Sequence, residues 1–166
     1  MLLAVDVDYR EAGAVAAGVA FSPGDAATPA WERVCPIAQV DEYEPGAFYK
    51  RELPCLLALL DAVPEPVHLV VIDGYVWLGD DRPGLGAHLH QATGLPVVGV
   101  AKTCFRSARA LEVVRGSEAR RPLYLTAVGC DPTEAAVWLR SMHGDHRLPT
   151  LLKRVDSLCR GHKGGA

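Results

Sequence analysis

Two aspartates interrupt an otherwise apolar stretch, LLAVDVDY, at residues 2–9. If this stretch is a β-strand, alternation places Asp6 and Asp8 on one face, which begins with apolar side chains. A carboxylate there costs on the order of several kcal/mol unless it is solvated, protonated, paired or bound to a metal. The residue types alone leave these four alternatives open.

A similar aspartate, Asp73, ends the apolar run VVID and precedes Gly74. In open α/β sheets, ligands bind outside the carboxyl ends of the strands, so Asp73 is a candidate for the same site as Asp6. The alternative is that Asp73 only caps a turn through its side chain, as aspartate before glycine often does.

Two further acids lie in predicted helices, Glu52 in KRELPCLL and Asp156 in LKRVDSLCR. Each has a simpler interpretation: Glu52 pairs with Lys50 or Arg51 in solvent, and Asp156 balances the two basic residues before it. Brought together, however, several carboxylates would be held ionised by Mg²⁺ or Mn²⁺, hard cations that take oxygen ligands.

Two basic candidates complete this set. Lys102 ends the predicted strand LPVVGVAK, where its ammonium group would reach a phosphate at the same sheet edge, and His88 in GLGAHLHQ is a candidate phosphate contact or proton carrier. The simpler alternatives are a strand-end lysine in solvent and a surface or core histidine.

The hydrophobic patterns predict three strands joined by short turns, then alternating helices and strands. Residues 107–122 are charged and are interpreted as a solvated loop or a small excursion. Pro36 favours an edge strand or bulge, Gly94 a helix C-cap, and Asp131 with Pro132 a helix start. The predicted strands are 2–9, 14–23, 31–40, 67–74, 95–102 and 122–129, and the predicted helices are 45–63, 84–94, 131–142 and 148–161.

This order predicts an α/β fold with a mixed central sheet, in which an antiparallel meander joins parallel strands and helices flank both faces. Length favours one domain over residues 1–160, followed by a flexible tail at 161–166. The net charge of -3 argues against a protein that holds nucleic acid by bulk positive charge, but it does not exclude nucleic acid as a substrate.

The five cysteines are scattered and odd in number, which favours reduced thiols in a cytoplasm. The first predicted strand begins at residue 2, so we expect no targeting peptide, and no segment has the length and apolarity of a membrane span. We expect a cytoplasmic monomer.

The joint order of the motifs resembles the endonuclease V family over nearly the whole chain. The matching segments are VDVDYRE, YEPGAFYKRELP, VVIDG followed by His88, LPVVGVAKT, PLYLTAVG and HRLPTLLKRVDSL. The resemblance implies an RNase H-like fold and a Mg²⁺-dependent endonuclease, with Mn²⁺ as a substitute. Its implied substrate is DNA containing deoxyinosine, or RNA containing inosine, cut near the modified base.

On this resemblance, Asp6 and Asp73 match the two central metal-binding aspartates, and Glu52 and Asp156 complete the metal shells. Lys102 matches the lysine that contacts the cleaved phosphate. Two divalent ions would activate a water and stabilise the leaving oxyanion, so no covalent protein nucleophile is required. Asp8 gains no role.

The resemblance also implies a nucleic-acid-binding set. Tyr43, Pro45 and Gly46 fall where the family has a wedge loop, although Glu42 and Glu44 place negative charge beside it. The other members of the set are Gly74, His88 and Lys102.

The chain departs from the family pattern where the substrate base is recognised. Val76, Gly79 and Gly129 replace characteristic residues, and a hairpin before the late strand is predicted to be missing. Because Val76 would add bulk beside a flipped base, we expect altered or relaxed base specificity.

Two other functions stay open from the sequence. One is a catalytically inactive, nucleic-acid-binding homologue of endonuclease V. The other is a small-molecule nucleotide phosphohydrolase that stacks its base on Tyr75 or Trp77, although these aromatics also fit ordinary packing.

Overall fold

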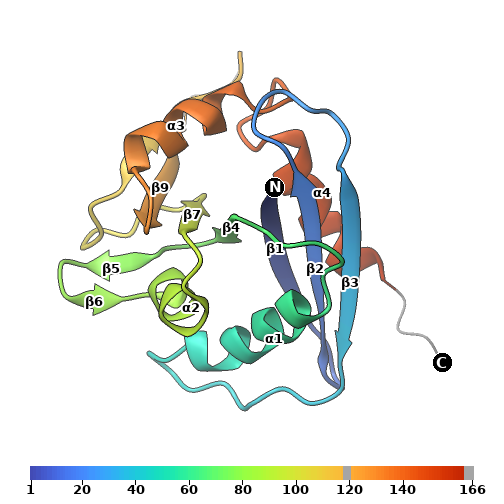
Figure 1. The fold of residues 1–166 in the computed structure, drawn as a ribbon. Coiled ribbons are helices and arrows are strands. Elements are labelled where there is room, and N and C mark those ends of the chain that lie inside the picture. The colour runs from blue at the N-terminus through green and yellow to red at the C-terminus, as the bar shows by residue number, and fades with distance from the viewer. Residues whose placement is uncertain (118–120, 163–166) are drawn as a thin grey trace.

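The computed structural model describes residues 1–117 and 121–162 and shows a seven-stranded sheet between two layers of helices (Figure 1). The strand order is β3-β2-β1-β4-β7-β9-β8, and β5 and β6 form a separate two-stranded ribbon. The strands are β1 (Leu2–Tyr9), β2 (Ala14–Phe21), β3 (Trp31–Ile37), β4 (Leu69–Asp73), β5 (Trp77–Gly79), β6 (Arg82–Pro83), β7 (Val97–Ala101), β8 (Leu111–Val113) and β9 (Leu123–Val128). The helices are α1 (Tyr49–Asp61), α2 (Leu85–Thr93), α3 (Pro132–Ser141) and α4 (Thr150–Gly161).

The sheet confirms the predicted mixture of strand directions. Strands β1, β2 and β3 form an antiparallel meander, and β3, with Pro36, lies at an edge of the sheet as predicted. Strand β4 pairs parallel to both β1 and β7, and α2 connects β4 to β7. The carboxyl ends of β1 and β4 therefore lie side by side at the centre of the sheet.

The helices cover the two faces of the sheet in pairs. Helices α3 and α4 pack on the face that contains Leu2 and Ala4, whereas α1 and α2 pack on the face that contains Leu3 and Val5. This division follows the alternation of β1, which places Asp6 on the α4 side.

The predicted helix ends are also found. Gly94 has a left-handed φ of 75° and caps α2, with its N–H donating to His90 O. The Asp131 carboxylate accepts a hydrogen bond from Thr133 N at 2.8 Å, and Pro132 is the first residue of α3.

The prediction of a solvated loop or small excursion over residues 107–122 misses a short strand, and the absence of a hairpin before β9 stays a prediction. Strand β8 lies in this segment and pairs antiparallel with β9, and Val113 is fully buried. Arg115 is only 5% exposed, because its guanidinium donates to the carbonyl oxygens of Met142, Gly144 and His146. Arg115, which was predicted to lie in solvent, therefore satisfies backbone carbonyl groups of the loop after α3. Residues 118–120 lie outside the described part.

The ribbon of β5 and β6 was not predicted either, because each strand is too short for a periodic pattern. At the other end of the chain, Gly161 closes α4, and residues 163–166 of the predicted tail lie outside the described residues. Among the helices that the structure describes, none has the length and apolar character needed to cross a membrane.

Strand β7 needs a glycine at position 99, because the backbone of the turn after Asp73 passes close to this residue. A Cβ atom at this position would lie 2.4 Å from the carbonyl oxygen of Gly74 and 3.0 Å from Val76 N. We expect Gly99→Ala to lower the free energy of unfolding by about 1 to 3 kcal/mol, measured by urea unfolding, because the turn after Asp73 must move.

The matched control is Gly161→Ala, where no atom lies within 4 Å of the added Cβ. This variant should unfold within about 0.5 kcal/mol of the wild type. Equal stability of the two variants would contradict the close approach at Gly99.

Candidate metal centre and adjoining groove

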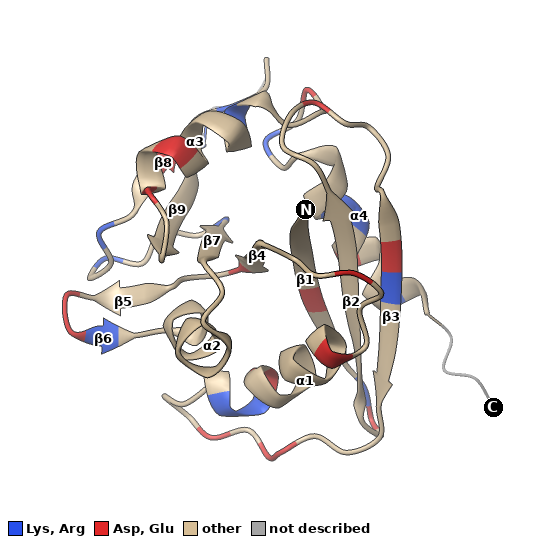
Figure 2. Cartoon of the chain, viewed as in Figure 1, with Lys and Arg blue, Asp and Glu red and all other residues tan. Residues whose placement is uncertain are grey.

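Four of the five predicted catalytic residues line one small cleft of about 30 Å³ at the centre of the sheet. They are Asp6, Asp73, Lys102 and Asp156. Figure 2 shows acidic segments on β1, at the end of β4 and on α1. Elements distant in the sequence therefore bring the acids together.

The register of the parallel pair explains the meeting of the two aspartates. Val5 pairs with Ile72, so Asp6 and Asp73 each follow a paired residue at the same edge of the sheet. The Asp6 Oδ1 atom accepts a hydrogen bond from Val7 N at 2.9 Å, which holds the carboxylate at the sheet edge.

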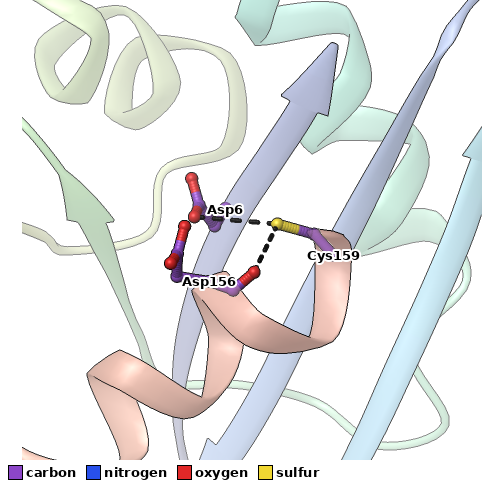
Figure 3. Close-up of side chains that lie close together, drawn as sticks. All are labelled: Asp6, Asp156 and Cys159. Carbon is purple, nitrogen blue, oxygen red and sulfur yellow. Dashed lines mark hydrogen bonds between the residues drawn. The ribbon is translucent and has the colours of Figure 1, made fainter. Parts of the chain in front are cut away.

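Helix α4 adds a carboxylate and a thiol to Asp6, as Figure 3 shows. One ligand atom from each of Asp6, Asp156 and Cys159 lies within 4.8 Å of the other two. The Cys159 Sγ atom lies 3.7 Å from Asp6 Oδ2 and 3.2 Å from Asp156 O. Asp156 and Cys159 share one helix face because they are three residues apart.

The acids of the cleft disfavour one another's ionisation. Burial, aided by the nearby charges of Asp73 and Asp156, raises the pKa of Asp6 from its usual 3.8 to about 6, although the hydrogen bond from Val7 N opposes this shift. A side-chain hydrogen bond between Asp6 and Asp156 also favours the protonated form. Without a counter-charge, the ionised form of Asp6 is therefore less stable in this cleft than it is in water.

Asp73 and Lys102 form the exposed side of the cleft. Asp73 is exposed as a residue, but the protein atoms around its carboxylate partly exclude solvent and so raise its pKa. The positive charge of Lys102 opposes this shift and the negative charge of Asp156 adds to it. Lys102 is thus close enough to act electrostatically on the site.

Glu52 does not line the small cleft but lies buried beside it on α1. It is 8% exposed, and burial, followed by repulsion from Asp6 and Asp73, raises its pKa from 4.5 to about 8. The simpler interpretation of Glu52 is wrong: Lys50 pairs with Glu44 at 3.0 Å, and the Arg51 guanidinium lies 3.9 Å from the centre of the Tyr9 ring.

Asp156 does pair with a basic residue, but not with those before it. Arg160 Nε donates to Asp156 Oδ1 at 2.7 Å, whereas Arg154 pairs with Glu32 at 2.6 Å. Asp8 pairs with Arg10 at 3.2 Å, which agrees with a side chain outside the site.

The residues of this centre fit a divalent cation. Within residues 1–117 and 121–162, no ion pair or hydrogen bond satisfies the buried Glu52 carboxylate, and its charged neighbours are acids. A group of carboxylates that raise one another's pKa is stabilised in its ionised form by a cation with oxygen preference. The donor set is thus typical of a metal centre.

The raised pKa of Glu52 predicts how the stability of the metal-free protein depends on pH. Because the folded-state pKa of about 8 exceeds the usual 4.5, the protonated form stabilises the fold below about pH 4.5, and this stabilisation is lost as pH rises towards 8. We expect the free energy of unfolding, measured in chelator by urea titration, to fall by a few kcal/mol over this range.

Two variants test this assignment. Glu52→Gln should flatten the decline, whereas Glu65→Gln, a change at an exposed surface acid, should keep the wild-type slope. A decline of the same slope in Glu52→Gln would show that other groups cause it.

A groove of about 430 Å³ adjoins the metal centre through Asp73. Gly46, Gly74 and His88 of the predicted nucleic-acid-binding set line this groove. The His88 ring stacks on Tyr49 with centroids 3.6 Å apart, and burial lowers its pKa. Aromatic residues make up much of the remaining wall, together with Arg82: they are Phe48, Tyr49, Tyr75 and Phe105.

Tyr43 and Pro45, the other predicted wedge residues, are exposed and do not line the groove. The negative charge expected beside them is reduced, because Glu44 pairs with Lys50. Their predicted contact with nucleic acid stays a prediction.

The three departures from the family pattern lie in different places. The side chain of Val76 is fully buried in the core and does not line the groove, so the bulk expected beside a substrate base is absent there. Its N–H donates to Thr126 Oγ1 at 2.8 Å. Gly79 lines a separate pocket, and Gly129 follows β9 with a φ of 75°.

Two residues near the site were missed from the sequence. Cys159 was counted only as one of five thiols, although its spacing from Asp156 placed it on the same helix face. Arg147 Nη2 donates to Lys102 O at 2.5 Å and to Pro122 O at 2.7 Å, so it holds the backbone that carries Lys102. The sequence gives no signal for a contact made by a loop arginine.

A mixed sheet with acids gathered where β1 and β4 lie side by side defines an RNase H-like protein. The sequence model of the Endonuclease V family matches residues 1–141, so the chain belongs to the endonuclease V family. The chain is 36% identical to endonuclease V of Streptomyces avermitilis over 139 residues, which cover 71% of this chain and 60% of that protein.

Solved structures agree with this assignment. The crystal structure of the Streptomyces avermitilis endonuclease V is similar with a TM-score of 0.71 at 28% identity, over 96% of this chain and 79% of that one. The fold is also that of Ciona intestinalis endonuclease V, solved in complex with a 23mer DNA containing an inosine, with a TM-score of 0.78 at 18% identity over 96% of this chain and 83% of that one.

The matches cover only part of the relatives and only part of this chain. The chain spans about 60% of the length of the curated relatives that it matches. The family match also ends at residue 141, before α4. The argument for Asp156 therefore depends on its position in the structure.

Proposed function

We propose that the protein is a metal-dependent endonuclease that hydrolyses a phosphodiester bond in DNA containing deoxyinosine or other damage, with RNA as a further substrate. The observation that carries this proposal is the convergence of acids and Lys102 in one cleft that opens, at Asp73, onto a groove lined by aromatic residues. Membership of the endonuclease V family supports the reaction class.

In this proposal, Asp6, Asp73, Glu52 and Asp156 hold Mg²⁺, for which Mn²⁺ can substitute. The bound metal would lower the pKa of a water and stabilise charge on the phosphate oxygens. Asp6 is near enough to both Asp73 and Asp156 for their charges to raise its pKa, so it would be the central ligand of the set. Lys102 places a positive charge where the scissile phosphate would lie, so it offsets the added negative charge of the transition state.

The groove would bind the nucleic acid beside the cut. Exposed aromatic faces such as Phe48 and Phe105 stack on unpaired bases, a contact worth about 1 to 3 kcal/mol per base. The complex of the Ciona intestinalis protein with inosine-containing DNA supports this choice of ligand. Because Val76 lies in the core, any change in base specificity would have to come from the groove residues themselves or from Gly79 and Gly129.

The experiment is cleavage of a panel of labelled oligonucleotides by the full chain with Mg²⁺ or Mn²⁺. The panel contains deoxyinosine in single and double strands, inosine in RNA, mismatches, branched DNA and unmodified controls. We expect cleavage of at least the deoxyinosine substrate, and loss of this cleavage in Asp73→Asn.

The other outcomes distinguish the alternatives. Binding of the oligonucleotides without cleavage by a folded protein would indicate the inactive homologue. Release of phosphate from nucleotides without cleavage of any oligonucleotide would indicate a small-molecule phosphohydrolase. Equal cleavage of all substrates, unmodified DNA included, would show relaxed specificity.

A further inference from the structure

We propose that Asp6, Asp156 and Cys159 form a site for a thiophilic divalent cation, such as Zn²⁺ or Cd²⁺, whose binding excludes the activating Mg²⁺. The binding part of this inference depends only on the three side chains. The inhibition that should follow rests on the proposed nuclease function.

The geometry of the thiol carries the first step. Cys159 is 1% exposed, and its Sγ atom contacts the Asp6 carboxylate as well as the backbone carbonyl oxygen of Asp156 in its own helix. Metal–sulfur and metal–oxygen bonds of about 2.3 and 2.1 Å at a tetrahedral angle separate sulfur from oxygen by about 3.6 Å. The observed separation of 3.7 Å between Cys159 Sγ and Asp6 Oδ2 matches this edge.

The surroundings of the group also indicate a cation. Glu52, nine-tenths buried, has Asp6 and Asp73 as its charged neighbours, and within the described residues no hydrogen bond or ion pair satisfies its carboxylate. Asp6 and Asp156 lie within hydrogen-bonding reach of each other, although both are acids. Arg160 pairs with Asp156, so within the described residues the negative charge left without an ion pair includes that of Asp6 and Glu52.

The ligand chemistry separates the two kinds of metal. Mg²⁺ binds oxygen in a near-octahedral arrangement and gains little from a sulfur atom. Zn²⁺ and Cd²⁺ bind thiolates readily and accept four-coordinate sites of mixed sulfur and oxygen ligands. On binding, the Cys159 S–H bond breaks, the sulfur forms a bond to the cation with its electron pair, and the proton is released to solvent.

The experiment is a titration of the reduced full chain with Cd²⁺ in the absence of nucleic acid, followed by sulfur-to-cadmium charge-transfer absorption. We expect one equivalent of Cd²⁺ to produce the band and to release a proton. Cys159→Ser should abolish the band and weaken Cd²⁺ binding at least about tenfold more than it weakens Mn²⁺ binding, since a direct ligand matters at least as much as a supporting contact.

The matched control is Cys55→Ser, which removes the other thiol that is only 1% exposed. This variant should keep the band, as should Cys104→Ser, which removes an exposed thiol. If Cys159→Ser does not fold, the cadmium NMR shift of the wild type decides, because a sulfur ligand moves it away from the range of all-oxygen sites.

The inference is overturned if the wild type gives no band with Cd²⁺, or if Cys159→Ser keeps the band and the affinity. A second experiment measures activity. Cd²⁺ or Zn²⁺ should inhibit Mg²⁺-supported cleavage, and Cys159→Ser should raise the concentration of Cd²⁺ or Zn²⁺ needed for inhibition at least about tenfold. A protein that binds Cd²⁺ through Cys159 but cleaves nothing would contradict the proposed function and leave the metal site standing.

Discussion

Asp6→Asn is expected to lower the rate of oligonucleotide cleavage by at least about 10³-fold, because loss of the central metal ligand removes several kcal/mol of transition-state stabilisation. Asp6 is the acid that contacts both the β4 and the α4 sides of the centre, as its interactions with Asp73 and Asp156 show. Single-turnover cleavage of the deoxyinosine substrate at saturating Mg²⁺ measures the effect.

The same chain offers a matched control two residues away. Asp8 lies on the same face of β1, but its carboxylate pairs with Arg10, so Asp8→Asn loses only a partly exposed ion pair worth up to about 1 kcal/mol. Cleavage by this variant should stay within about tenfold of the wild type. A similar loss of cleavage rate in both variants would contradict the assignment of Asp6 as a metal ligand.

Stability separates lost chemistry from lost structure in this experiment. In metal-free protein at neutral pH, the Asp6 charge is poorly solvated and is repelled by Asp73 and Asp156. Asp6→Asn removes this unfavourable charge, so the free energy of unfolding should be unchanged or higher. A markedly less stable variant would make its inactivity uninformative about metal binding.

Lys102→Met is expected to lower the rate by about 10² to 10³-fold, the usual effect of removing one group that stabilises charge in the transition state. The loss should appear mainly in kcat rather than in KM, because the ammonium group acts most strongly on charge that develops during the reaction. Lys153→Met, at an exposed position of α4, is the control and should cleave at the wild-type rate.

The pH profile gives this variant a second readout. Lys102 lowers the pKa of Asp73, so its removal should raise that pKa. If ionised Asp73 is required, the activity that remains should rise at a higher pH than in the wild type. A parallel loss at every pH, with no shift, would mean that Lys102 does not act on Asp73.

The local patterns of the sequence were sufficient for most of the sheet. Alternation in β1 correctly assigned Asp6 to one face, and the apolar runs of β4 and β7 correctly indicated buried parallel strands. These predictions hold because each depends on neighbours in the same strand and on the simple rule that buried faces are apolar. The edge position of β3 followed from Pro36 in the same way.

The failures share a different cause. Arg115 was assigned to a solvated loop because arginine is usually exposed, but its side chain satisfies carbonyls contributed by residues far along the chain. Val76 was expected at a base pocket, yet the turn after Asp73 directs it into the core. The predicted pairing of Glu52 with Lys50 was also wrong, because Lys50 forms its ion pair with Glu44 of the preceding loop. Tertiary contacts decide each of these cases.

Because α4 supplies two members of the candidate metal centre, the centre can form only after the end of the chain has folded onto the sheet. Cys159 reaches Asp6 across 153 residues of chain, and Arg10 of the β1–β2 turn holds the end of α4 through the carbonyl oxygen of Cys159 at 3.0 Å. A partly folded chain that has formed only the meander therefore lacks the ligands that α4 supplies. An enzyme that cuts nucleic acid would in this way stay harmless until its whole sheet and its last described helix are in place.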